Sequence, residues 1–167
     1  MSDVETRLSR VEARFALGDL VARYCAGVDD RDFHAIGDLF TEDGFFGHVG
    51  EGGAQGRAAI RQYYRGRLQD IPYSFHYPHT HTIDVHDATT ASGEVTAHAE
   101  MARVALPPLI AALRYSDDYR FEDGAWRFAR RELRFFYFAP VDEVQSGLIG
   151  DLRIRWPGPP RAADIPA

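Results

Sequence analysis

The sequence predicts an α+β fold, in which helices come first and long antiparallel strands follow them. Apolar residues recur every three or four positions between Leu8 and Cys25, which is typical of an amphipathic helix. From Thr80 to Val85 polar and apolar residues alternate, and this strand-like period of two returns in residues 91–106, 110–121 and 126–138. We expect a cone-shaped α+β barrel whose strongly curved, mostly antiparallel sheet packs on about three N-terminal helices.

The three helices are predicted from local signals. The first runs to about Ala26, and Asp32 is well placed to cap a short second helix. The apolar face of that second helix extends to Phe40, and residues 41–44 end it. Residues 56–68 form the third helix, because Ile60, Tyr63, Tyr64 and Leu68 fall on one side of it.

Turn residues divide the rest of the chain. Asp123-Gly124 is a strong hairpin signal between two long strands. Pro107-Pro108 is expected to interrupt the sheet. The pattern decays after Pro140, so residues 1–140 are predicted to form one domain. Residues 141–167 are predicted to be a C-terminal extension, partly loose, with a short helix or an added strand within 148–156.

Composition excludes several classes of function. The 167 residues carry a formal net charge of −6 with no basic run, which argues against nucleic acid as a partner. No apolar stretch is long enough to span a bilayer, so no membrane partner and a cytoplasmic location are expected. The single cysteine, Cys25, rules out an internal disulfide and a cysteine-based zinc site.

The strand that follows Pro78 begins its apolar side with His79 and His81. An apolar face that admits histidine is either a core with a satisfied hydrogen bond or the wall of a pocket, and we favour the pocket. The His-x-His pair could also bind a metal ion, but the sequence offers no obvious third ligand other than Glu100 or His98. We therefore expect neither a metal nor an organic cofactor.

Several short motifs occur along the chain in a recognisable order and spacing. They are Tyr24-Cys25-Ala26-Gly27-Val28-Asp29, Asp32-Phe33, residues 39–44, His79-Thr80-His81-Thr82-Ile83, residues 89–93, Tyr115-Ser116-Asp117-Asp118-Tyr119 and residues 123–128. This series resembles the SnoaL-like branch of the nuclear transport factor 2-like superfamily, which includes scytalone dehydratase, bile-acid 7α-dehydratase and the polyketide cyclases. The resemblance extends to about Phe138 and implies the cone-shaped fold for residues 1–140.

The resemblance also implies a set of catalytic residues. In the dehydratase members a tyrosine and an aspartate near the end of the first helix face a histidine at the start of a strand. Here these are Tyr24, Asp29 and His79, and Arg134 matches an arginine late in the last strand. The carboxylate of Asp29 would fix the tautomer of His79, which acts as acid or base, while Tyr24 stabilises negative charge on oxygen.

Further residues are expected to bind the substrate. They are Phe46, Tyr64, His81, His98, Glu100 and Tyr137. The predicted function is a cofactor-independent acid–base lyase that acts on a small ring-containing or aromatic hydroxy compound, either by dehydration or by carbon–carbon cleavage such as formaldehyde loss.

Two other classes of function stay open. The first is a non-catalytic ligand-binding or assembly module, in which Tyr24, Asp29 and His79 do not converge. The second is a ketosteroid-isomerase-type isomerase or polyketide cyclase, for which Glu100 would supply the base. The resemblance further implies a homodimer or homotrimer formed through the open face of the sheet.

Overall fold

The computed structural model describes residues 3–165, and its centre is a six-stranded sheet. Three helices are α1 (Asp3–Asp29), α2 (Phe33–Asp38) and α3 (Arg57–Arg67). The strands are β1 (Phe40–His48), β2 (Gly52–Gln55), β3 (Ser74–Val85), β4 (Thr90–Arg103), β5 (Leu106–Glu122) and β6 (Ala125–Pro140). The predicted α+β order of helices and strands is therefore confirmed.

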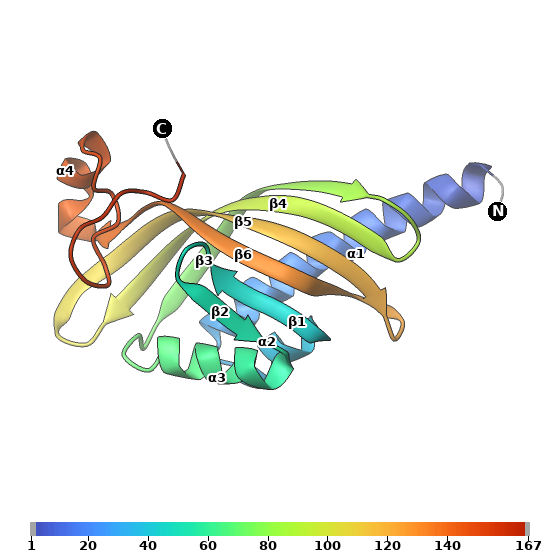
Figure 1. The fold of residues 1–167 in the computed structure, drawn as a ribbon, viewed down its shortest axis with the longest axis horizontal. Coiled ribbons are helices and arrows are strands. Elements are labelled where there is room, and N and C mark those ends of the chain that lie inside the picture. The colour runs from blue at the N-terminus through green and yellow to red at the C-terminus, as the bar shows by residue number, and fades with distance from the viewer. Residues whose placement is uncertain (1–2, 166–167) are drawn as a thin grey trace.

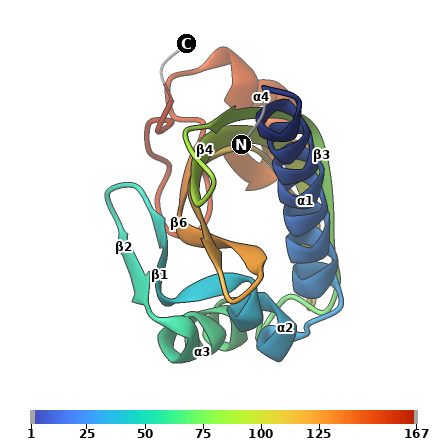
Figure 2. The same cartoon turned by 90° about the vertical axis from the view of Figure 1, so that its right-hand side faces the viewer.

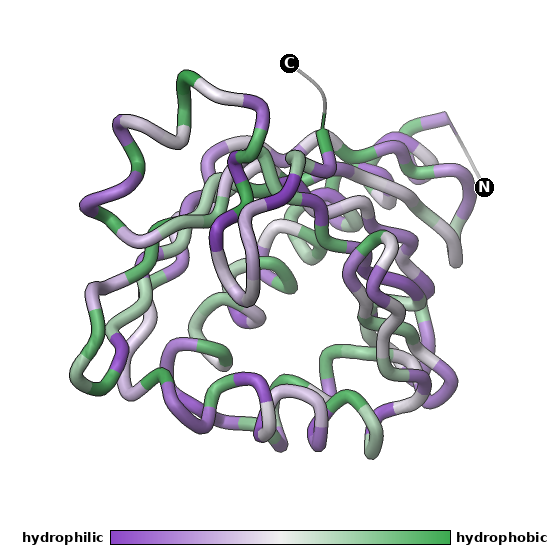
Figure 3. Tube along the Cα trace, turned by 60° about the vertical axis from the view of Figure 1, so that its left-hand side comes forward, coloured by the Kyte–Doolittle hydropathy of each residue, from purple (hydrophilic) through white to green (hydrophobic). Residues whose placement is uncertain are grey.

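The sheet is open and runs in the order β2-β1-β6-β5-β4-β3. Every neighbouring pair is antiparallel except β1 and β6, which run parallel, so the sheet is mixed. Figure 1 shows the long strands β4, β5 and β6 curving together over the helices. In Figure 2, α1 closes one side of the curve, and α2 and α3 lie below it. The Cα trace in Figure 3 encircles a common interior.

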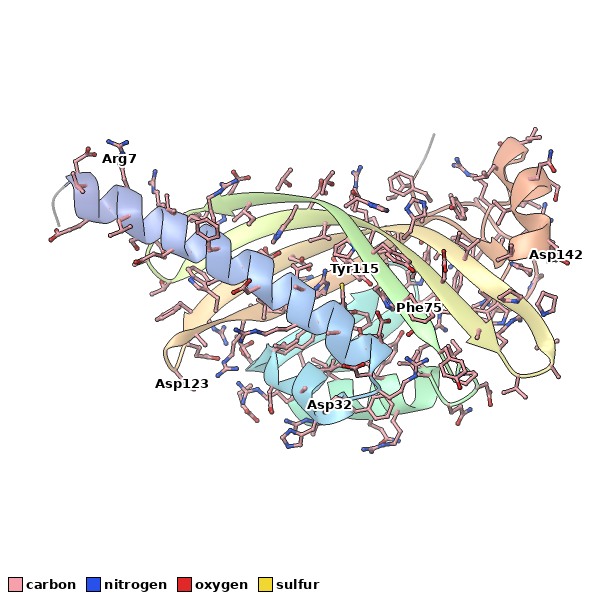
Figure 4. All side chains as sticks on the ribbon, turned by 180° about the vertical axis from the view of Figure 1, so that it is seen from behind. Arg7, Asp32, Phe75, Tyr115, Asp123 and Asp142 are labelled. Carbon is pink, nitrogen blue, oxygen red and sulfur yellow. The ribbon has the colours of Figure 1, made fainter. Side chains whose placement is uncertain are left out.

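Aromatic rings from helices and strands fill that interior. Tyr24 of α1 packs edge-on against Tyr115 of β5 and Phe128 of β6, with ring centroids 5.7 Å apart in both pairs. All three residues are at most 2% exposed. Figure 4 labels Tyr115 between the ribbon of α1 and the sheet. Because edge-to-face pairs add to the stability gained by burial, these contacts fix how α1 lies across the sheet.

Burial of α1 is concentrated in its second half, and in the first half Ala13 alone is buried. Leu17, Leu20 and Val21 are at most 5% exposed, whereas Leu8 and Phe15 are 55% and 75% exposed. The sequence pattern predicted one continuous apolar face from Leu8 onward, and this was wrong for the first half. In Figure 1 the N-terminal end of α1 projects beyond the strands. No helix within residues 3–165 is both long and apolar enough to cross a bilayer.

Two of the predicted element boundaries were wrong. Residues 41–44 do not end α2; they lie within β1, because Phe40 already pairs with Phe128 of β6. Pro107 and Pro108 do not end the strand but lie near the start of β5, exposed, at an irregularity of the β4–β5 ladder between the paired Leu106 and Leu109. Proline is tolerated there because that backbone has no hydrogen bond to donate.

Other boundaries follow the local signals. Asp32 caps α2, since its carboxylate accepts a hydrogen bond of 2.9 Å from the backbone N–H of Ala35. Asp123 and Gly124 join β5 to β6 with φ of 52° and 76°. Two successive positive φ values are what a tight hairpin turn demands, so the predicted turn is confirmed.

The segment after β6 lies against the sheet. It holds a 3-10 turn (Val141–Glu143), α4 (Val144–Ile149) and an extended stretch in which Ile154 bridges to Phe138. Asp164 anchors it, because Oδ2 accepts a 2.8 Å hydrogen bond from the backbone N–H of Phe135 and lies 2.7 Å from Nε2 of His48. The division of the chain at residue 140 stays a prediction.

Replacing Asp164 by alanine should release this segment while leaving the sheet folded. The backbone N–H of Phe135 and the ring of the buried His48 would both lose an acceptor, and an unpaired buried polar group is costly. We expect faster hydrogen exchange at Phe135 and a red shift in the fluorescence of Trp156. Asp151→Ala, an exposed change in the same segment, is the control. Unchanged exchange at Phe135 would contradict the anchoring role of Asp164.

Candidate active site

A bulge in β3 decides which histidines face the interior. In the β3–β4 ladder His76 lies opposite Ala99 and His81 opposite Val95, and both partners are buried. The register shifts between Pro78 and Thr80, so two residues in this stretch share one partner position. His76 and His81 consequently both point inward, although they are five residues apart.

The predicted placement of His79 was wrong. His79 lies in the bulge on the outer face, is exposed, and its Nε2 lies 2.7 Å from Nδ1 of His98. Simple alternation counted backward from Ile83 puts His79 on the inner side, but the extra residue in the bulge turns it outward. His79 therefore does not meet Asp29 or Tyr24, and His76 takes the position that was predicted for it.

His76 and Asp29 form a hydrogen-bonded pair. Nδ1 of His76 lies 2.7 Å from Oδ1 of Asp29, and the backbone N–H of His76 donates to Oδ2 at 2.9 Å. Because the carboxylate accepts both bonds, Nδ1 carries the proton of the neutral ring and Nε2 keeps its lone pair. The arrangement leaves Nε2 available to accept a proton from a bound molecule.

The backbone around Asp29 is held by one arginine. Arg31, whose φ is 61°, donates to the carbonyl oxygens of Val28 and Asp29 and to Oγ of Ser74. Ser74 in turn donates to Oδ1 of Asp29 at 3.0 Å. Burial alone would raise the pKa of Asp29, but the hydrogen bonds from His76 and Ser74 outweigh it and lower that pKa below its usual 3.8. The carboxylate is thus charged at neutral pH.

Three buried phenols line the same pocket as His76. They belong to Tyr24, Tyr64 and Tyr115. The hydroxyl groups of Tyr24 and Tyr64 are hydrogen-bonded to each other. Burial raises the pKa of each phenol well above 10, so all three are proton donors rather than phenolates.

The pocket itself is mainly apolar. Its walls include Val28, Phe46, Leu68, Ile71, Ala99, Met101, Leu113, Leu133, Phe135, Phe138 and Trp156. These side chains come from α1, the residues that follow α3, four strands and the C-terminal segment, so the pocket lies between the helices and the concave face of the sheet. Such a cavity with a few convergent polar groups is the usual form of a small-molecule site.

A charged network lies behind the phenols. Arg131 is fully buried, its guanidinium carbon lies 4.1 Å and 3.9 Å from the ring centroids of Tyr24 and Tyr115, and Nε lies 3.4 Å from Oδ1 of Asp117. Burial raises the pKa of Asp117 to about 6, although the charge of Arg131 opposes this. At neutral pH the two residues therefore form a buried ion pair.

His81 belongs to this network. Tyr119 donates its one proton to Oδ2 of Asp117 at 2.8 Å, so its oxygen accepts the 2.9 Å hydrogen bond from Nε2 of His81. Burial and the charge of Arg131 lower the pKa of His81 to about 4, and its ring is neutral at physiological pH. It does not line the pocket, so its predicted contact with substrate is not supported.

The predicted positions of four further residues were wrong. Arg134, His98, Glu100 and Tyr137 lie on the outer face of the sheet. Arg134 donates to Oγ of Ser116, and the rings of His98 and Tyr137 lie 6.2 Å apart. For Arg134 and Tyr137 the cause is two bulges in β6, opposite Tyr119 and Leu113, which shift the alternation and which sequence counting could not detect. His98 and Glu100 simply alternate with the buried Ala97 and Ala99 of β4. Phe46 and Tyr64, by contrast, line the pocket as predicted.

Sequence reasoning missed His76, Tyr115 and Arg131. His76 is 47 residues after Asp29, and only the pairing of β3 with β4 reveals its direction. The sequence predicts that Arg130 and Arg131 face opposite sides, one as a surface charge and the other able to pair with Asp118 or Glu132. It does not say which is which: Arg130 is the exposed one and pairs with Glu132 at 2.6 Å, and the buried Arg131 lies against Asp117 instead. No group of three or more His, Cys, Asp or Glu side chains suited to a metal ion occurs within residues 3–165.

Comparison with known proteins places this architecture in a family. The model of the SnoaL-like domain matches residues 9–132. The chain belongs to the SnoaL-like family. An uncharacterized protein of Mycobacterium tuberculosis is 28% identical over 127 residues, which cover 74% of this chain and 86% of the relative.

Solved structures share the fold of this SnoaL-like protein. A putative scytalone dehydratase from Novosphingobium aromaticivorans has a TM-score of 0.75 and 24% identity, covering 79% of this chain and 89% of that one. A hexachlorocyclohexane dehydrochlorinase from Novosphingobium barchaimii has a TM-score of 0.75 and 22% identity, covering 81% and 94%. At these identities the similarity supports the cone-shaped fold.

Proposed function

We propose that this SnoaL-like protein is a cofactor-independent lyase that removes water from a small ring-containing hydroxy compound by acid–base chemistry. The observation that carries the proposal is that His76, held by Asp29 behind it, and three neutral phenols line one mainly apolar pocket. The names of two similar structures, a dehydratase and a dehydrochlorinase, support a β-elimination.

The proposed reaction uses His76 as the base, Asp29 as its partner and the phenols as proton donors. Nε2 of His76 takes a proton from the carbon beside a carbonyl, and the electrons of that C–H bond form the new C=C bond. The C–O bond of the β-hydroxyl breaks, and the hydroxyl leaves as water with a proton donated by a phenol. Asp29 balances the charge of the imidazolium, while Tyr24 or Tyr64 donates to the enolate oxygen.

The phenols favour a hydroxyl as the leaving group. Hydroxide is a poor leaving group and needs an acid, whereas chloride does not. Burial keeps the protons on Tyr24, Tyr64 and Tyr115. A related carbon–carbon cleavage that loses formaldehyde would use the same base on a hydroxymethyl O–H, with an enolate stabilised by the same donors.

The isomerase alternative depends on a strand carboxylate in the pocket, and Glu100 does not provide it. Glu100 is exposed on the outer face. The predicted homodimer or homotrimer, the cytoplasmic location and the small aromatic partner remain proposals. Half-exposed rings on the outer face, including Tyr77 and Tyr137, would suit a second copy, and equilibrium sedimentation would test this.

The test is a substrate screen with a matched inactive variant. Wild type and His76→Asn should be incubated with cyclic β-hydroxy ketones, hydroxylated aromatic compounds and hydroxymethyl phenols, with product formation followed by mass spectrometry. We expect loss of 18 mass units from at least one compound with wild type and none with His76→Asn. A His79→Asn variant, altered on the outer face, should keep full activity. Equal turnover by His76→Asn and wild type would refute the assignment.

A further inference from the structure

Three basic side chains that line the pocket differ in whether a carboxylate lies beside them. They are His48, His76 and Arg67. Nδ1 of His48 lies 2.9 Å from Oε2 of Glu51, and its Nε2 is bonded to Asp164. His76 is paired with Asp29. Arg67 alone of the three has no carboxylate within 4 Å among residues 3–165.

Four other arginines of α3 and the C-terminal segment are paired with carboxylates. On α3, Arg57 and Arg61 form ion pairs with Glu42 and Asp38. In the C-terminal segment, Arg155 pairs with Glu143, and Arg161 pairs with Glu51 and Asp164. The carboxylates of this region are thus engaged by these four arginines, and none of them forms an ion pair with Arg67.

Arg67 is held in place by an aromatic ring instead. Its guanidinium carbon lies 5.1 Å from the ring centroid of Trp156, which also lines the pocket. A guanidinium on an aromatic face keeps its in-plane N–H donors free. Because the surrounding walls are apolar, a charge there interacts more strongly with an opposite charge than it would in water.

We propose that Arg67, backed by Trp156, is a subsite for a carboxylate carried by the substrate. The site would take a ring-bearing hydroxy acid whose carboxylate receives two parallel N–H bonds from the guanidinium, the geometry for which arginine is best suited. This inference rests on the proposed function in one respect, namely that the pocket is where the substrate binds. It adds the charge of the substrate and a residue that selects for it.

The experiment compares acids with their uncharged amides. Wild type should be titrated with benzoate, 4-hydroxybenzoate and cyclohexanecarboxylate and with the three corresponding amides, by calorimetry and by the fluorescence of Trp156. We expect at least one acid to bind about tenfold or more tighter than its amide, because hydrogen bonds to charged groups are the stronger ones. Added salt should weaken only the acid.

Variants identify the residue responsible. Arg67→Met should abolish the preference for the acid and leave the affinity for the amide unchanged, and Arg67→Lys should keep part of the preference. Arg65→Met is the matched control, since Arg65 lies on the same helix, is exposed and does not line the pocket. Its preference should equal that of wild type.

The outcomes separate this subsite from the lyase proposal. His76→Asn should lose turnover and keep the preference for the acid. Equal binding of every acid and its amide by wild type, no detectable binding of any acid, or an undiminished preference in Arg67→Met would each overturn the subsite. None of these results would affect the loss of turnover in His76→Asn, on which the proposed function depends.

Discussion

Replacing Asp29 by asparagine is expected to lower kcat/KM on the substrate found in the screen by about 10²- to 10⁴-fold, the usual range for general acid–base catalysis. Asparagine can direct its amide N–H₂ at Nδ1 of His76, which makes Nδ1 the acceptor and puts the ring proton on Nε2. The base would then be blocked by its own proton, as happens when the aspartate of a catalytic triad is changed to asparagine.

Kinetic readouts distinguish this positioning role from a structural one. The loss should appear in kcat with little change in KM, because Asp29 does not line the pocket. The pH–rate profile should also lose the wild-type limb that reports the base. Asp32→Asn is the matched control, since asparagine is an equally good N-cap for α2. Equal activity of Asp29→Asn and wild type would show that the pair is not catalytic.

The second large effect is expected on stability. Replacing Arg131 by methionine should lower the free energy of unfolding by about 3–5 kcal/mol, which is the cost of breaking a buried ion pair on one side. Asp117 would be left without its counter-charge, and Tyr24 and Tyr115 would lose the cation that lies on their faces. Urea denaturation at pH 7 would measure the loss.

The neighbouring residue provides the control. Arg130→Gln removes an arginine whose side chain is 45% exposed and paired with Glu132, so its cost should not exceed about 1 kcal/mol. In Arg131→Met the buried Asp117 should also be protonated at higher pH than in wild type, and the stability difference should therefore shrink as the pH falls from 7 to 5. A similar loss in both variants would show that burial does not matter.

Local sequence signals were enough for the helices, the cap and the last hairpin. Asp32 and Asp123-Gly124 act through their own backbone, so their roles could be predicted without knowing any partner strand. Tyr24 and Asp29 were predicted from the resemblance to the SnoaL-like dehydratases, and both lie near the end of α1 as that resemblance implies.

The histidine and the arginines could not be placed in this way. β3 has a bulge just after His76, between Pro78 and Thr80, and β6 has one just before Arg131, between Phe128 and Arg130. A bulge depends on how a strand pairs with its neighbour, so the sequence of one strand does not reveal it. One extra residue reverses which of the following side chains face the interior of the protein. For this reason His76 faces inward in place of His79, and Arg134 faces outward. A sequence count that allowed a break at Pro78 would have recovered His76.

The same irregularity in β3 also bears on solubility. β3 is the last strand of the sheet, and a long outermost strand invites another chain to add on through its free backbone groups. Pro78 has no backbone N–H, and the bulge beside it breaks the regular row of backbone groups along β3. Deleting the extra residue of the bulge would make β3 a regular strand. We expect this variant to lose the catalytic orientation of His76 and also to aggregate through the exposed edge of β3.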